Sequence, residues 1–257
     1  MHPKVPRISR RKTAAAHPAP PTRPVTAAGE SPPGPDTRTR ILQAAFQLFH
    51  EQGYHATGVA TILREAGVNA GSLYHFFASK EELLVGVLEF ALVLLRPAVM
   101  DPAERRCDDP LERVFALLEQ YREGLHAGGC KMGCPIGNLA LEVSDDNVPA
   151  RALIHQNFEN WILAVRKWLD DAGDRLPANL DRAQLARFVL TVMEGGIMQA
   201  RAAGHLDPFD DSVAQLRFYF DSLQKVAAGE RAASAGYPPH TKAIRRAGGR
   251  SVRPRKD

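Results

Sequence analysis

The segment from Thr57 to Leu83 constrains the fold of this chain more than any other. It reads TGVATILREAGVNAGSLYHFFASKEEL, and it has room for one short helix, a turn at Gly67, a second short helix and the start of a third at Ser79. Two short helices that meet at a tight glycine turn form a helix-turn-helix, whose second helix enters the major groove of DNA. The sequence therefore predicts a segment that binds duplex DNA.

Helical spacing continues through the rest of the chain. Apolar residues recur three and four positions apart and alternating β-branched runs are absent, so we expect an all-α fold. Asp36 and Thr57 are expected to cap the first two helices and Asn69 the third. Ser79 opens the fourth, where Glu82 completes a capping box. Three helices are expected in the helix-turn-helix domain and six beyond it, over about residues 37–52, 57–66, 69–77, 79–95, 110–126, 135–143, 148–172, 181–203 and 208–227.

Charge divides the chain into three parts. Residues 1–35 hold six Lys or Arg against one acidic residue, and residues 231–257 hold eight against one, although the whole chain is only +4. The part between them is therefore acidic. Because both ends are rich in Pro, Ala and Gly, we predict disordered basic tails over 1–35 and 228–257 that add weak, salt-dependent attraction to DNA phosphates. For the N-terminal tail, a solubilising extension or a misassigned start codon is an equal alternative.

Composition also indicates a compartment. The most apolar stretch, Leu83 to Met100, is interrupted by Arg96 and Pro97, and it falls short of the roughly 18 continuous apolar residues that span a membrane. We expect a long buried helix there, ended by Pro97. The basic N-terminus has no apolar core of a signal peptide, and three cysteines do not form a disulfide framework. We therefore expect a cytoplasmic protein without a membrane partner.

Three short blocks carry a family resemblance. The turn Ala66-Gly67-Val68, the GSLYHFF block at 71–77 and the SKEEL block at 79–83 resemble the TetR family of bacterial one-component transcriptional repressors, and residues 39–54 are similar to the first helix of that family. The resemblance implies an operator-binding domain at 36–82 and an effector-binding and dimerisation domain at 83–227. It also implies that Thr57, Tyr74, His75 and Lys80 contact the DNA backbone. His75 as an ordinary solvated surface histidine remains an alternative.

The start of the second short helix is suited to reading bases. Its small residues would let the backbone approach base edges, and they are Asn69, Ala70, Gly71 and Ser72. The family often has Lys or Arg where this chain has Ala70, and residues 36–82 hold four Lys or Arg against five acidic residues. Either Asn69 and Ser72 read bases with the help of water, or Arg38 and Arg40 at the end of the basic arm provide the missing attraction. Leu73 and Phe76 are expected in the core beneath.

The resemblance further implies a pocket for a small effector within about residues 83–205. Aromatic and methionine side chains on successive helices are the candidates for its lining: Phe90, Phe115, Tyr121, Met132, Phe158, Trp161 and Met193. Each of them is also compatible with ordinary core packing, because such stripes occur wherever helices pack.

A cysteine-containing segment, 126–142, is the second informative place. Its Gly133-Cys134 and the NLALE run that follows resemble a branch of TetR regulators that includes sensors of electrophiles and of quinone-like or flavonoid-like compounds. Cys134 would lie at a helix start near Lys131, which favours the thiolate. Alternatively, Cys130 and Cys134 are small buried apolar residues. We expect no metal and no cofactor, because a glycine pair breaks the spacing of His126 from the two cysteines and four paired ligands are lacking.

The last two helices are expected to make a homodimer. Over 181–203 and 208–227 they present apolar residues at helical spacing, and two copies would form a symmetric four-helix interface on a palindromic operator. An enzyme is not expected, because GxSxG, a P-loop, HExxH and GxGxxG are absent. A nonspecific architectural DNA-binding protein remains an alternative, although the acidic body favours regulated, specific binding.

Overall fold

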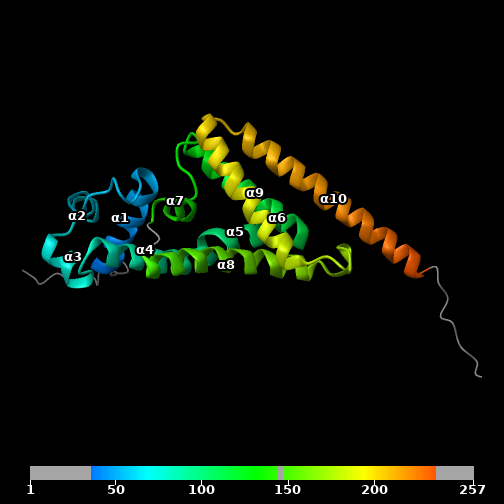
Figure 1. The fold of residues 1–257 in the computed structure, drawn as a ribbon, viewed down its shortest axis with the longest axis horizontal. Helices are drawn as coiled ribbons and strands as arrows, with labels where there is room; N and C mark the ends of the chain where they lie inside the picture. The colour runs from blue at the N-terminus through cyan, green and yellow to red at the C-terminus, as the bar shows by residue number, and fades with distance from the viewer. Residues whose placement is uncertain (1–35, 144–146, 236–257) are drawn as a thin grey trace, which may run out of the picture. The chain divides into compact units, whose positions relative to one another are not determined.

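A computed structural model describes residues 36–143 and 147–235, and all regular structure in these residues is helical (Figure 1). The all-α prediction is confirmed, and the described residues form nine helical runs when α4, η1 and α5 are taken as one and the three-residue turn η2 is left out. The elements are α1 (Thr37–Gln52), α2 (Val59–Ala66), α3 (Ala70–Phe76), α4 (Lys80–Leu94), the π-helix η1 (Leu95–Met100), α5 (Asp101–Arg106), α6 (Pro110–Ala127), α7 (Pro135–Glu142), α8 (Val148–Asp171), the 3-10 turn η2 (Gly173–Arg175), α9 (Arg182–Ala203) and α10 (Asp207–Ala235).

Side-chain caps begin several of these helices as the sequence predicts. The Asp36 carboxylate accepts a hydrogen bond from Thr39 N at 2.7 Å, and the Ser79 hydroxyl accepts one from Glu82 N at 3.1 Å. Glu82 in turn accepts from the backbone N–H of Ala78, just ahead of the cap. Such contacts satisfy backbone donors that a helix start leaves unpaired.

The predicted C-terminal tail begins later than expected. α10 continues to Ala235, past the expected end at residue 227, so the prediction of a disordered tail from residue 228 is wrong for 228–235. The alanines there, with Glu230 and Arg231, have high helix propensity, which apolar periodicity does not detect. Residues 1–35 and 236–257, where the remaining basic tails were predicted, lie outside the described part of the chain.

The fourth predicted helix does not end at Pro97. α4 passes into the π-helix η1 and then into α5, so that residues 80–106 form one helical run. A proline lacks its own N–H, and its ring clashes with the carbonyl four residues back. The wider π winding accommodates it, and Asp101 N donates to Arg96 O, five residues back. By length and composition this run could cross a membrane. Its side chains Leu83, Leu84 and Leu88 are fully buried in the protein, although only 39% of the apolar window as a whole is buried.

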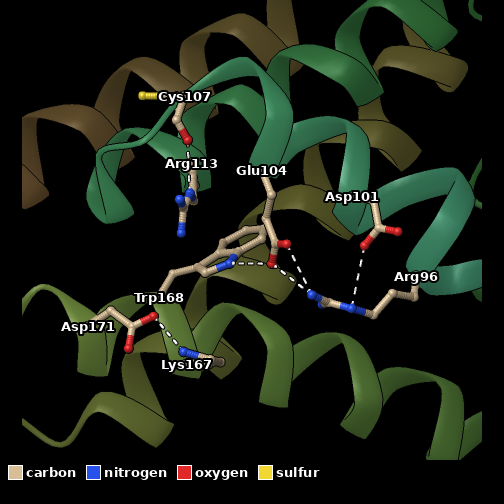
Figure 2. Close-up of polar contacts among 8 residues, drawn as sticks. All are labelled: Arg96, Asp101, Glu104, Cys107, Arg113, Lys167, Trp168 and Asp171. Atoms are coloured by element: carbon tan, nitrogen blue, oxygen red, sulfur yellow. Dashed lines mark hydrogen bonds and ion pairs between the residues drawn. The ribbon is translucent and has the colours of Figure 1, made fainter.

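Polar contacts fasten this run to α8 (Figure 2). Arg96 Nη2 lies 3.1 and 3.0 Å from the two Glu104 oxygens, and Trp168 Nε1 donates to the same carboxylate at 3.0 Å. Burial tends to raise the pKa of Glu104, but the Trp168 hydrogen bond and the Arg96 charge outweigh it and lower the pKa. The π turn is thereby fixed against α8.

Two hydrophobic cores hold the described residues. One joins α1 to α4 and includes Leu139 of α7 and Ile154 of α8. The other lies among α6, α8, α9 and α10, around the fully buried Trp168. Phe158 packs against both. Helices beyond residue 82 therefore complete the core under the helix-turn-helix, and the described residues form one compact unit.

Candidate DNA-binding surface and effector cavity

α2 and α3 form a helix-turn-helix. α2 ends at Gly67, whose φ of +63° lies in the left-handed region, and Val68 N donates back to Leu63 O at 3.0 Å. Left-handed backbone favours glycine, which lacks a Cβ. Asn69 then caps α3, as predicted, and Ile62 of α2 and Leu73 of α3 are buried in the same hydrophobic core.

The outer face of α3 carries most of the predicted DNA contacts. The side chain of Tyr74 is 54% exposed, and Asn69, Ala70, Gly71 and His75 are exposed as well. Asn69 Oδ1 accepts from both Ser72 N (2.8 Å) and Ser72 Oγ (3.1 Å), which leaves the Asn69 amide N–H groups to donate outward. Ser72 is half-buried. These side chains form a polar tip narrow enough for a DNA groove.

Two placements on this domain differ from the prediction. Thr57 does not cap α2, whose N-cap is Gly58. Its side chain is fully buried, and its hydroxyl donates to Gly53 O at 2.7 Å and Leu48 O at 3.2 Å, so it ties the end of α1 and is not available to a phosphate here.

The prediction that Phe76 lies in the core is also wrong, because its side chain is 37% exposed whereas Phe77 is buried. The chain leaves α3 in an extended conformation at Phe77, and this turns the Phe77 ring inward against Gly86 of α4. Leu73 is buried as predicted.

Basic side chains flank α3 on two sides. Lys80 Nζ donates to Tyr54 O at 2.6 Å and lies 4.4 Å from the centre of the Tyr54 ring, so it is half-buried at the start of α4. Burial lowers the pKa of Lys80, against the opposing charges of Glu81 and Glu142. Arg38 and Arg40 on α1 are exposed, and the Arg38 guanidinium lies 5.4 Å from the Phe77 ring centre.

α7 touches the helix-turn-helix domain at both of its ends. Just before it, Gly133 O lies 2.6 Å from His50 Nε2 of α1. At its last residue, Glu142 accepts from His55 N at 3.2 Å through its carboxylate, and its backbone oxygen lies 2.8 Å from His55 Nε2. We call these contacts the α7 clasp. The clasp joins α7 to the end of α1 and to the turn that precedes α2.

A cavity of about 210 Å³ lies beside the N-terminus of α7, between α4, α6, α8 and α9. Four of the predicted lining residues surround it: Tyr121, Phe158, Trp161 and Met193. The other three do not. Phe90 packs on Phe46, Phe115 packs on Phe220 below Arg217, and Met132 lines a neighbouring hollow.

Cys134 and Glu194 meet in the wall of this cavity. Cys134 caps α7 through a weak hydrogen bond from Gly137 N to Sγ at 3.4 Å, and the Glu194 carboxylate lies in the same wall. Burial and the Glu194 charge raise the pKa of Cys134 well above its usual range. The expected lowering by the helix start is therefore wrong in direction, because desolvation of the thiolate outweighs the helix dipole. Cys130 is buried, in line with a small apolar residue.

Two regions of this chain match models of known protein families. Residues 41–87 match the model described as bacterial regulatory proteins, tetR family, and residues 110–215 match the LmrA/YxaF-like C-terminal domain of transcriptional regulators. This chain belongs to the TetR family. The resemblance drawn from the sequence is confirmed, and the family consists of DNA-binding transcriptional regulators rather than enzymes.

The similarity to individual TetR-family relatives extends over nearly the whole length of each relative. The HTH-type transcriptional regulator LmrA of Bacillus subtilis is 33% identical over 67% of this chain and 90% of its own. The transcriptional repressor NemR of Escherichia coli is 23% identical over 71% of this chain and 92% of its own. A crystal structure of a TetR regulatory protein from Rhodobacter sphaeroides superposes with a TM-score of 0.63, at 26% identity, over 70% of this chain and 96% of that one.

Several residues that the structure places at these sites carry no local sequence signal. His50, His55 and Glu142 meet only through the fold, and no local pattern pairs them. Glu194 did have a signal, because it is the one charged residue in the apolar run from Phe188 to Met198. Among the described residues, no group of three or more His, Cys, Asp or Glu is arranged to hold a metal ion.

Proposed function

We propose that this TetR-family chain is a homodimeric repressor that binds a palindromic operator through α3 of each protomer and leaves it when a small effector fills the cavity. The observation that carries this proposal is the position of α7. Its first turn contributes Cys134, Pro135 and Ile136 to the cavity wall, and its last residue clasps the turn before α2. A ligand that displaces α7 would thus act directly on the helix-turn-helix domain.

The DNA contacts proposed are Asn69 to Ser72 at base edges, with Tyr74, His75 and Lys80 on phosphates. Arg38 and Arg40 would add to them from α1, on the side where the basic N-terminal segment joins the chain. Thr57 is not among the side-chain contacts, because it is buried. With so few cations on the domain, two copies must act on one operator for useful affinity, and binding must weaken as salt rises.

Exposed apolar side chains on α9 and α10 support the homodimer. These two helices lie side by side (Figure 1). Phe188 and Tyr219, 47% and 41% exposed, stack edge to face with ring centres 6.0 Å apart over a hollow lined by Val192 and Leu216. Exposed aromatic patches of this kind mark protein–protein contacts, and a twofold pairing would cover them.

The test is selection of bound duplexes from a random DNA pool with the full chain. We expect an imperfect palindrome, bound in competition with excess random DNA. An unsymmetrical single site would contradict the dimeric operator complex. Equal competition by random DNA would instead favour the nonspecific architectural alternative. A regulator of this kind would act in the cytoplasm, where bacterial DNA lies.

A thiol sensor built on Cys134 is the second candidate, since this thiol lines the cavity. Its raised pKa argues against a reactive thiolate. Cys134→Ser decides: a response to oxidants or electrophiles that survives this substitution excludes Cys134 as their sensor. The same comparison with Cys130→Ser addresses the other cysteine.

A further inference from the structure

A half-buried carboxylate in the cavity wall lacks a counter-charge. Glu194 Oε1 is buried and has no hydrogen-bond partner among the residues that the structure describes. The other oxygen, Oε2, packs so closely on Gly137 of α7 that a side chain at position 137 would collide with it. Burial raises the pKa of Glu194, and the neutral Cys134 thiol beside it lowers that pKa by less.

Leaving such a group unpaired is unfavourable. A buried carboxylate that loses the hydrogen bonds of water costs at least about 1–3 kcal/mol for each unsatisfied group, and more when it is charged. Natural sites compensate buried charges with a charge of opposite sign. No positively charged side chain among the described residues forms an ion pair with Glu194. A ligand in the cavity would therefore have to supply the compensating positive charge.

The remaining wall of the cavity fits the body of such a ligand. It is apolar along α4, and on α6 and α8 it presents the aromatic rings of Tyr121, Phe158 and Trp161. The Trp161 N–H is already directed to the Tyr121 hydroxyl, at 3.3 Å, so the two rings are fixed relative to each other. Aromatic faces attract cations, most strongly when water is excluded.

We propose that this cavity binds a small lipophilic amine in its protonated form, with the ammonium on Glu194 Oε1 and the apolar part among Tyr121, Phe158 and Trp161. This inference rests on the proposed function, because it names the chemical class of the effector for the same cavity. An anionic ligand would meet the like charge of Glu194. A neutral alcohol would supply a hydrogen bond but no counter-charge. The volume of about 210 Å³ is below the roughly 300 Å³ at which drug-sized sites begin, so the amine must be small.

The test compares 4-butylbenzylamine with its neutral counterpart 4-butylbenzyl alcohol, by calorimetric titration of the full chain at neutral pH without DNA. We expect the amine to bind about tenfold more tightly than the alcohol, since hydrogen bonds to charged groups are worth about 1.5–3 kcal/mol. Equal affinities, or tighter binding of the alcohol, would overturn the inference. This comparison uses the unaltered chain and does not depend on the folding of any variant.

Glu194→Gln removes the charge and keeps the shape. We expect it to weaken amine binding about tenfold while it changes alcohol binding by less than about threefold. The matched control is Glu89→Gln, at an exposed position of α4, which should change neither affinity. Undiminished preference for the amine in Glu194→Gln would also overturn the inference.

Operator binding is then measured with and without the amine, which separates the two proposals. If the amine binds through Glu194 but leaves DNA affinity unchanged, the ligand class stands and the effector role in the proposed function fails. If other compounds release the operator while the amine and the alcohol bind alike, the regulator stands and the ligand class is refuted.

Discussion

At the scale of single residues, the structure separates side chains that hold the helix-turn-helix together from those that face outward. Thr57 and Tyr74 are the clearest pair, because the family resemblance implies a DNA contact for both. Thr57 is fully buried, whereas more than half of Tyr74 is exposed. Substitution of Thr57 should therefore affect the stability of the fold, and substitution of Tyr74 should affect operator affinity.

Thr57→Val keeps the shape of the side chain and removes its hydroxyl. The carbonyls of Leu48 and Gly53 then lose a donor, and the free energy of unfolding should fall by about 1–3 kcal/mol, measured by urea denaturation. Thr57→Ser, which keeps the hydroxyl, should retain most of the stability. If Thr57→Val lowers operator affinity at unchanged stability, the buried role is wrong.

Tyr74→Ala should weaken operator binding while it leaves stability almost unchanged. An exposed side chain outside the core changes stability by about 0.5 kcal/mol or less, whereas the loss of one phosphate contact per protomer should weaken operator binding about tenfold. Fluorescence anisotropy on the selected operator measures the affinity. Tyr74→Phe tells whether the hydroxyl makes the contact. Undiminished affinity in Tyr74→Ala would remove Tyr74 from the DNA surface.

The half-buried Glu194 makes stability depend on pH. Because burial raises its pKa above the ordinary 4.5, the folded chain holds this proton more tightly than the unfolded chain. The free energy of unfolding contributed by Glu194 therefore falls as pH rises from 4.5 through the raised pKa, and it stays low above. At neutral pH without ligand, Glu194→Gln should be about 1 kcal/mol more stable than the natural chain. Urea denaturation across this pH range should show the difference vanish in acid, and a difference independent of pH would contradict the argument.

At the scale of helices, α7 touches both the cavity and the DNA-binding domain, as α1 and α4 also do through Phe46 and Ala91. The Glu142 carboxylate holds His55 N and lies against Gly53, at the turn that leads from α1 into α2. Its removal should loosen this turn locally while the two hydrophobic cores remain intact.

Glu142→Ala should accordingly speed amide hydrogen exchange at residues 53–57 by about fivefold, which corresponds to about 1 kcal/mol of local opening free energy. Mass spectrometry of peptic fragments measures it, and fragments of α10 serve as the internal reference. Glu89→Ala on the exposed side of α4 is the control variant. Unchanged exchange at the turn would mean that the α7 clasp does not hold it.

Local signals in the sequence predicted most of these helices, because caps and turns act over a few residues. Asp36, Gly67, Asn69 and Ser79 begin or end helices where they were expected to. Pro97 misled the prediction, since the π winding that accommodates it is fixed by contacts to α8. The α7 clasp and the Glu194 environment depend on residues far apart in the chain, and no local pattern encodes them. Four of the seven residues predicted for an effector pocket line this cavity, because large apolar side chains line cores and cavities alike.

At the scale of the whole molecule, one protomer presents a single α3 to DNA, and its acidic body adds little attraction. Operator binding by this chain thus depends on the pairing that we propose for α9 and α10. The aromatic side chains exposed there would be the centre of the interface, because buried aromatic anchors contribute most of the binding free energy at protein–protein contacts.

Phe188→Glu places a charge at that centre. Phe188 is half-exposed and contacts Tyr219, so the folded protomer tolerates a polar side chain at this position whereas a paired surface does not. We expect the mass measured by light scattering to fall to that of one chain, and operator affinity to fall about a hundredfold, because a single helix-turn-helix then binds only a half-site. Leu163→Glu is the matched control: Leu163 is also apolar and 54% exposed, but it lies on α8, outside the proposed interface. If Phe188→Glu leaves the mass unchanged, or if Leu163→Glu reduces it equally, then α9 and α10 do not form the interface, and the two DNA-binding helices must be brought together by another surface.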